Sequence, residues 1–209
     1  MVRSVLIAEK QIDYALAGLF LVLVGVSVYS STRTYDSLIR VEVLASIPLN
    51  FLAAYSFIVR ARPLVPTYAS EIGVPLLSFL LPFFILNNVA FLPADYSSWW
   101  GIVVAVPGML IAVAAILTLR RAFAILPSVR GVITGGPYRY VRHPLYLGEI
   151  IYVVGLMLLR FNLLSIGLLA LSMIALLVRI RMEERKLSIY PVYREYLEEV
   201  RYRLIPGLY

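Results

Sequence analysis

The chain has 209 residues, of which 61% are hydrophobic and 15% charged, and its mean hydropathy is +0.87. An ordinary soluble domain carries about 25% charged residues, so this composition predicts an integral membrane protein. With no cysteine and one histidine, the sequence lacks the residues for disulfides, zinc thiolate sites or multi-histidine clusters, and we expect no metal. The net charge of +7 fits contact with anionic lipid, and we expect no nucleic-acid binding.

Four long apolar stretches predict transmembrane helices, because each is close to the ~20 residues that a spanning helix requires. Two shorter stretches follow, separated by three residues, and predict a helical hairpin whose second arm continues to about residue 188. The predicted fold is therefore an all-α integral membrane protein with four transmembrane helices, a C-terminal helical hairpin and a cytosolic amphipathic helix. The long stretches are 14–29, 41–59, 72–92 and 99–119, and the hairpin arms are 145–159 and 163–178.

Basic residues predict how the chain is oriented in the membrane. With a cytosolic N-terminus, sixteen of the nineteen lysines and arginines fall on the inner side, and only Arg33, Arg40 and Arg160 fall outside. The positive-inside rule therefore predicts a multi-pass protein with both termini in the cytoplasm. The first apolar stretch lacks a cleavage pattern and is expected to be a retained helix. We expect one membrane domain over 1–209, with a four-helix part over 1–119 and a cofactor-binding catalytic part over 120–209.

The segment 136–149, GPYRYVRHPLYLGE, surrounds the lone histidine at the start of the hairpin. Pro144 suits the first position of a helix, so the helix should begin beside His143. Its N-terminal N–H groups, with Arg139 and Arg142, would attract a carboxylate or phosphate. Alternatively, these basic residues only anchor the hairpin at the lipid headgroups. Glu149, inside the apolar arm, is a functional candidate because ionisable groups are costly there.

The second arm ends in RIRMEERKL, which carries two adjacent carboxylates. On a helical period, Glu183 shares a face with apolar residues and lies one turn after Arg179. Glu184 lies about 100° around the helix, and we expect it to be solvated. The simpler alternative is that both glutamates form ordinary surface ion pairs.

A last helix is predicted to begin at Pro191. Its apolar side chains recur at helical spacing and would form one face of an amphipathic lid. This lid would cover the site, lie on the membrane surface, or do both, and amphipathicity alone favours the surface. The residues of this face are Tyr193, Tyr196, Leu197, Val200 and Leu204.

Three segments resemble, in order and spacing, the isoprenylcysteine carboxyl methyltransferase family and its phospholipid-methylating relatives. These segments are GPYRYVRHPLYLGE, EERKL and YPVYREYLEEVRYRLIP. The resemblance covers residues 119–206 and implies S-adenosyl-L-methionine as cofactor, bound between the hairpin and the C-terminal segment. It implies catalytic roles for Arg142, Arg179 and Glu183, with the arginines meeting carboxylates. The cofactor-binding residues that it implies are His143, Tyr146, Gly148, Glu183, Glu184, Tyr193 and Tyr196.

The expected function is therefore methyl transfer to a lipophilic acceptor, most simply the carboxylate of an isoprenylcysteine-like lipid or prenylated substrate. An ionised carboxylate needs no general base, so positioning would supply most of the catalysis. An amine acceptor would need a base, either His143 or Glu149. The main alternative is an NADPH-dependent membrane sterol or lipid reductase, which the chain resembles at RHPLYLGE and at Tyr202-Arg203 before Ile205-Pro206. A scaffold with a degenerate site is a third possibility.

Overall fold

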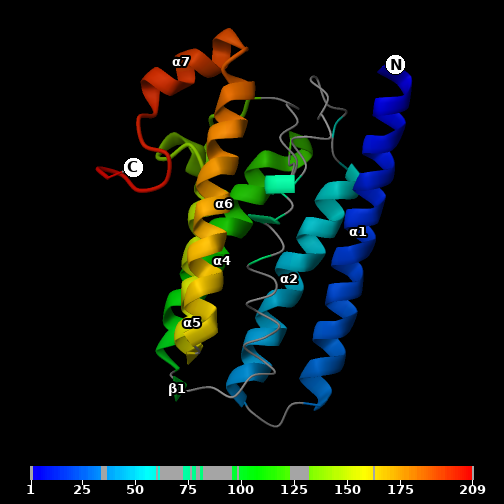
Figure 1. The fold of residues 1–209 in the computed structure, drawn as a ribbon, viewed down its shortest axis with the longest axis vertical. Helices are drawn as coiled ribbons and strands as arrows, with labels where there is room; N and C mark the ends of the chain where they lie inside the picture. The colour runs from blue at the N-terminus through cyan, green and yellow to red at the C-terminus, as the bar shows by residue number, and fades with distance from the viewer. Residues whose placement is uncertain are drawn as a thin grey trace.

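The computed structural model describes residues 2–33, 37–59, 61, 73–75, 77–78, 81, 96–97, 99–122, 132–161 and 163–208. This part of the chain is mainly helical, with one pair of two-residue strands and an extended C-terminal tail. Figure 1 shows two groups of helices beside each other: α1 with α2, and α4 with α5 and α6. The short helix α7 lies across one end of α6. The protein is therefore a helical bundle with an added C-terminal segment at one end.

Helices α1 (Val2–Arg33) and α2 (Ser37–Val59) form a hairpin and contain the first two predicted apolar stretches. The ring of Phe20 stacks on that of Phe57 with centroids 5.8 Å apart, and Ile116 of α4 packs against the same core. This core joins the two groups of helices. The third predicted helix, 72–92, lies mostly outside the described residues.

Helices α4 (Trp100–Leu119) and α5 (Pro144–Leu159) are antiparallel and very close together, and both agree with prediction. Small residues on both helices allow the approach. A Cβ atom added to Gly155 would lie 2.5 Å from the Cα atom of Ala105, and one added to Gly148 would lie 2.5 Å from the backbone nitrogen of Ala112. Close contact between backbones through small residues is a typical way for membrane helices to associate. The sequence contained this pattern, but our prediction did not use it.

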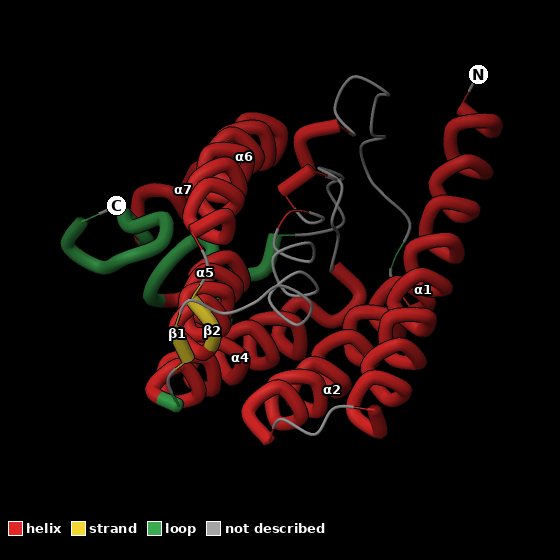
Figure 2. The backbone as a smooth tube through the Cα atoms, turned by 60° about the horizontal axis from the view of Figure 1, so that its bottom comes forward, coloured by secondary structure: helices red, strands yellow, loops and turns green. Residues whose placement is uncertain are grey.

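The predicted helical hairpin is confirmed, with α6 (Leu163–Leu187) as its second arm. The turn is not a simple connection, because β2 (Arg160–Phe161) pairs antiparallel with β1 (Tyr96–Ser97), as Figure 2 shows. Large side chains separate α5 from α6, whereas α5 and α4 meet at glycines. The main partner of α5 is therefore α4 and not the other arm of its hairpin.

Helix α7 (Pro191–Glu199) begins where the sequence predicted. It ends earlier than the apolar spacing suggested, because Val200 leaves the helical conformation with φ −112° and ψ 97°. The backbone then runs beside the junction before α5, where Arg142 and His143 donate to the carbonyls of Tyr202 and Arg203, both at 2.9 Å. Val200 and Leu204 are buried, as expected, but as part of this extended tail.

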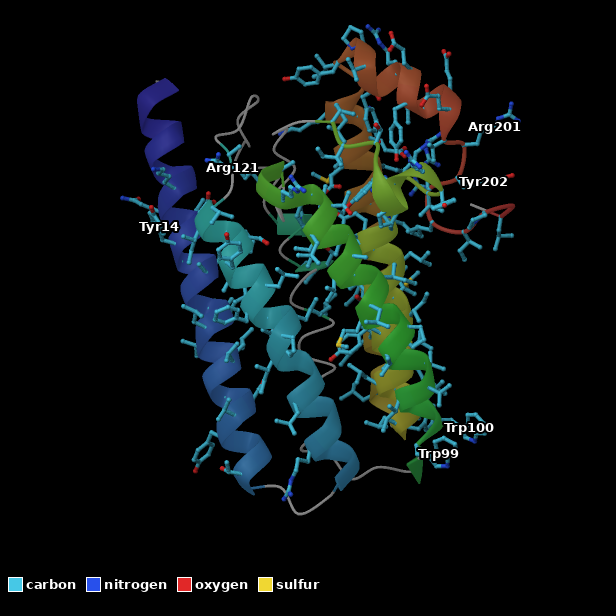
Figure 3. All side chains as sticks on the ribbon, turned by 180° about the vertical axis from the view of Figure 1, so that it is seen from behind. Tyr14, Trp99, Trp100, Arg121, Arg201 and Tyr202 are labelled. Carbon is cyan, nitrogen blue, oxygen red and sulfur yellow. The ribbon has the colours of Figure 1, made fainter. Side chains whose placement is uncertain are left out.

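Two described segments, Lys10–Tyr29 and Trp100–Ala122, are long and apolar enough to cross a membrane. Two shorter apolar helices, Ile47–Val59 and Pro144–Leu159, accompany them. The outward faces carry exposed apolar side chains, which is typical of a lipid-facing surface. Trp99 and Trp100 lie at the opposite end of the bundle from Arg201 and Tyr202 of the tail (Figure 3). Exposed apolar residues on α1, α2, α4 and α6 include Val22, Phe51, Ile58, Leu110 and Ile174.

Candidate functional site

The candidate site lies where α5 begins, beside the C-terminal half of α6. A 3₁₀ turn, η3 (Gly136–Arg139), leads into the junction, and α5 starts at Pro144 as predicted. The φ of Gly136 is +57°, and an added Cβ atom would lie 2.9 Å from Oγ1 of Thr118. Glycine is the residue that adopts this left-handed conformation at low cost, so it fixes the direction in which the chain reaches α5.

A buried polar cluster joins the first turn of α5 to α6. The hydroxyl of Tyr146 donates to Oε1 of Glu183 at 2.5 Å, and Nε of Arg179 donates to the same oxygen at 3.3 Å. The guanidinium carbon of Arg179 lies 4.8 Å from the centroid of the Tyr146 ring. A cation over an aromatic face is favourable, particularly away from water. The predicted pair of Arg179 and Glu183 therefore exists, but as part of a protein interior: Arg179 is only 2% exposed.

A second cluster surrounds Glu184. Its Oε1 accepts from Arg142 at 3.2 Å and lies 3.4 Å from Nε2 of His143, while its Oε2 accepts from Arg203 at 2.8 Å. The prediction that Glu184 is solvated is wrong, because the residue is 7% exposed. The reason is that the C-terminal tail folds back over α6 and brings Arg203 with it, which the helical period alone does not reveal.

Arg142 connects this second cluster to the end of α7. Besides Glu184, it donates to the carbonyl of Val200 at 2.6 Å and to that of Leu197 at 3.1 Å. These carbonyls lie at the C-terminal end of a helix, where no intrahelical donor is available for them. Arg142 therefore fixes the position of α7 and the tail relative to α5.

The partners of Glu184 keep it ionised. Burial by itself would raise the pKa of this carboxyl, but hydrogen bonds from His143, Arg203 and Arg142 outweigh burial and lower the pKa to about 2. A depressed carboxyl pKa stabilises the folded state at every pH above its ordinary value of 4.5. That stabilisation is lost as the pH falls from 4.5 toward about 2, so the cluster is intact at neutral pH.

Tyrosines close the site from the side of α7. Tyr193 and Tyr196 are buried against each other, with ring centroids 5.6 Å apart, and the hydroxyl of Tyr196 donates to the carbonyl of Tyr138 at 2.6 Å. Burial raises the pKa of Tyr138, Tyr193 and Tyr196, so their hydroxyls remain protonated donors. The apolar face of α7 packs on protein, so Tyr193 and Tyr196 cover this end of the bundle, as expected of a lid.

The structure thus brings together most of the predicted site residues, with one difference in role. His143 stacks on Tyr146, with centroids 5.4 Å apart and planes inclined by 12°. Gly148, in contrast, faces the backbone of α4, where an added Cβ atom would lie 2.7 Å from the carbonyl oxygen of Gly108. Its contacts are those of helix packing.

Two contributors were not among the predicted site residues. Arg203 binds Glu184, and Tyr138 supplies a backbone acceptor to the lid. Tyr138 lies in the segment GPYRYVRHPLYLGE and Arg203 in YPVYREYLEEVRYRLIP. Arg203 was interpreted only as part of the resemblance to reductases. Glu149 lies within electrostatic range of Arg179 and Glu183, as a functional candidate should. Among the residues described, no group of three histidine, aspartate or glutamate side chains could hold a metal.

The fold and these clusters define an apolar helical protein that gathers charged and aromatic side chains at one end of its bundle. Residues 100–189 match the model of the isoprenylcysteine carboxyl methyltransferase (ICMT) family. An 86-residue stretch is 33% identical to the protein-S-isoprenylcysteine O-methyltransferase A of Arabidopsis thaliana, covering 37% of this chain and 44% of that protein. Both comparisons confirm the predicted resemblance and point to a methyltransferase, although the match spans less than half of that relative.

Proposed function

We propose that this protein is a multi-pass membrane methyltransferase that uses S-adenosyl-L-methionine to methylate the carboxylate of an isoprenylcysteine-like lipid or prenylated substrate. One observation carries the proposal. The stretch that matches the methyltransferase family, 100–189, contains the linked cluster of Tyr146, Arg179 and Glu183 as well as Glu184. The match to the family and the buried charges of this chain therefore fall on the same residues.

The chemistry of the cluster fits the proposed cofactor. S-adenosyl-L-methionine carries a sulfonium, an ammonium, a carboxylate and ribose hydroxyls, and when bound it supplies an activated methyl group. Glu183 would hold its cationic or hydroxyl groups, and His143 and Tyr146, whose rings stack on each other, would lie beside them. The buried lid tyrosines, Tyr193 and Tyr196, would exclude water from this end of the bundle.

The two arginines take different roles in this proposal. Arg179 is buried, and among the described residues it donates only to Glu183 and, from Nη1 at 3.4 Å, to Ser78. We assign Arg179 the role of orienting a substrate carboxylate. Arg142 donates hydrogen bonds to Glu184 and to two carbonyls of α7 and the tail, so we assign it a positioning role. A carboxylate is ionised at neutral pH and attacks without a general base, so orientation is the main requirement.

The proposed arrangement in the membrane follows from the charges and the fold together. Residues 1–119 would embed the protein, and residues 120–209 would hold the cofactor at the cytoplasmic face. The N-terminus of α1 and the C-terminal segment lie at the same end of the bundle (Figure 1), which supports cytoplasmic positions for both. A lipid acceptor would reach such a site from within the bilayer.

Calorimetric titration of the detergent-purified protein tests the class of cofactor. We expect saturable binding of S-adenosylhomocysteine and no saturable binding of NADPH. Glu183→Gln should weaken the first, whereas Glu195→Gln, on the exposed face of α7, should leave it unchanged. Binding of NADPH alone would overturn the proposal in favour of a lipid reductase.

A further inference from the structure

A half-open groove of about 690 Å³ lies between α1, α2 and α4, and none of the residues of the two polar clusters is among its described lining residues. Its volume is in the range of small-molecule sites, which is about 300–1,000 Å³. The polar end is formed by Lys10, Arg120 and Arg121, and the remainder is lined by aromatic and apolar side chains. Figure 3 labels Tyr14 and Arg121, which lie toward the same end of the helices. The groove therefore has an amphipathic lining.

The charged residues that line the groove in the described part of the chain are all positive. Three cations line it, and the lining residues that the structure describes include no aspartate or glutamate. In the described part of the chain, Lys10 and Arg120 have no ion pair or hydrogen bond from their side chains. Three cations beside one cavity, with no carboxylate among its described lining residues, favour an anionic occupant.

The backbone at the end of α4 holds two of these cations in place. Arg121 donates from Nε to the carbonyl of Val59 at 3.1 Å, and its own carbonyl accepts from Ala61 at 2.8 Å. Arg120 adopts φ 49° and ψ −118°, which is unusual for a residue other than glycine. Strained conformations of this kind cost about 1–3 kcal/mol and cluster at ligand-binding positions.

Part of the groove wall is exposed on the apolar outer surface of the helices. Tyr55, Ile58 and Leu117 line it and are each more than half exposed. Side chains of this kind would contact an acyl chain, while the cations would contact a headgroup at the membrane boundary. A soluble anion would use only the polar end.

We propose that this groove binds an anionic phospholipid, with its phosphate at Lys10, Arg120 and Arg121 and the start of one acyl chain along Tyr55 and Leu117. The inference depends on the membrane position of the protein and is independent of the proposed reaction. Anionic lipids are concentrated in the cytoplasmic leaflet, and each nearby cation contributes about 1 kcal/mol to their attraction.

Native mass spectrometry tests whether the groove binds an anionic phospholipid. The protein is released from detergent with either phosphatidylglycerol or phosphatidylcholine, and the two lipids have identical acyl chains. We expect wild type to retain one phosphatidylglycerol and to lose phosphatidylcholine. Lys10→Gln combined with Arg120→Gln removes about 2 kcal/mol of attraction and should weaken retention about 30-fold. Arg181→Gln removes an exposed cation from α6 and should have no effect.

A second pair of variants tests the acyl part without changing charge. Leu117→Trp should obstruct the groove and reduce retention, whereas Leu110→Trp, equally exposed on α4 but outside the groove, should not. Equal retention of both lipids, wild-type retention by the double variant, or no difference between the tryptophan variants would overturn the inference. Displacement of the lipid by inorganic phosphate or by a farnesylated cysteine would also overturn it.

Discussion

Replacing Glu183 with glutamine is expected to reduce methyl transfer by about 100-fold while leaving the protein folded. The carboxylate accepts hydrogen bonds from Tyr146 and Arg179 at the centre of the cluster. Glutamine keeps the shape and removes the charge that would hold the cofactor. The fold should survive because Glu184, and not Glu183, fastens the C-terminal tail. The measurement is the initial rate of methyl transfer from S-adenosyl-L-methionine to a farnesylated cysteine.

The matched control for this variant is Glu195→Gln, which removes the same charge from an exposed position on α7. Its rate should equal that of wild type. A merely structural Glu183 would lower the thermal unfolding midpoint and leave the KM for the cofactor unchanged. Near-normal turnover by folded Glu183→Gln would remove this residue from the site.

Gly155→Ala is expected to destabilise the protein by about 1–3 kcal/mol or to prevent folding, because overpacking forces backbones apart. The added methyl group would lie 2.5 Å from the Cα atom of Ala105 and 2.7 Å from its Cβ atom. Since α5 carries His143 and Tyr146 at its first turn, displacement of this helix should reduce activity as well. The thermal unfolding midpoint in detergent measures the effect.

Gly167→Ala, on α6, provides a matched control, because a Cβ atom added to this glycine would meet no other atom within 4 Å. There, alanine should be neutral or stabilise the helix by up to about 1 kcal/mol. If the two alanine variants unfolded at the same temperature, the close packing of α4 on α5 would be disproved.

Hydropathy and helix-breaking residues predicted the described helices well. α5 begins at Pro144 and α7 at Pro191 because proline lacks an N–H that the first helical turn would not use. The partner of α5 was not predicted, because hydropathy does not distinguish the helices that it could contact. The spacing of the small residues in α4 and α5 was the feature of the sequence that indicated this contact. The pairing of β1 with β2 joins segments far apart in the sequence and left no local signal.

At the site, the spacing of Arg179 and Glu183 on one helix was enough to predict their ion pair. The environment of Glu184 was not predictable in this way, because Arg142 and Arg203 reach it from the junction and from the tail. The role of Arg142 also depended on the early end of α7, where it binds two carbonyls. Local periodicity therefore predicts contacts within a helix, and long-range contacts decide which charge is solvated.

Methyl transfer to a lipid carboxylate is tested by identifying the product formed from S-adenosyl-L-methionine with a labelled methyl group and S-farnesyl-N-acetylcysteine. We expect the label to enter a base-labile methyl ester, and we expect the corresponding carboxamide to accept none. An enzyme that binds S-adenosylhomocysteine but leaves the carboxylate unlabelled would contradict the proposed acceptor. Label that is stable to base would show that methyl transfer occurs to a different atom.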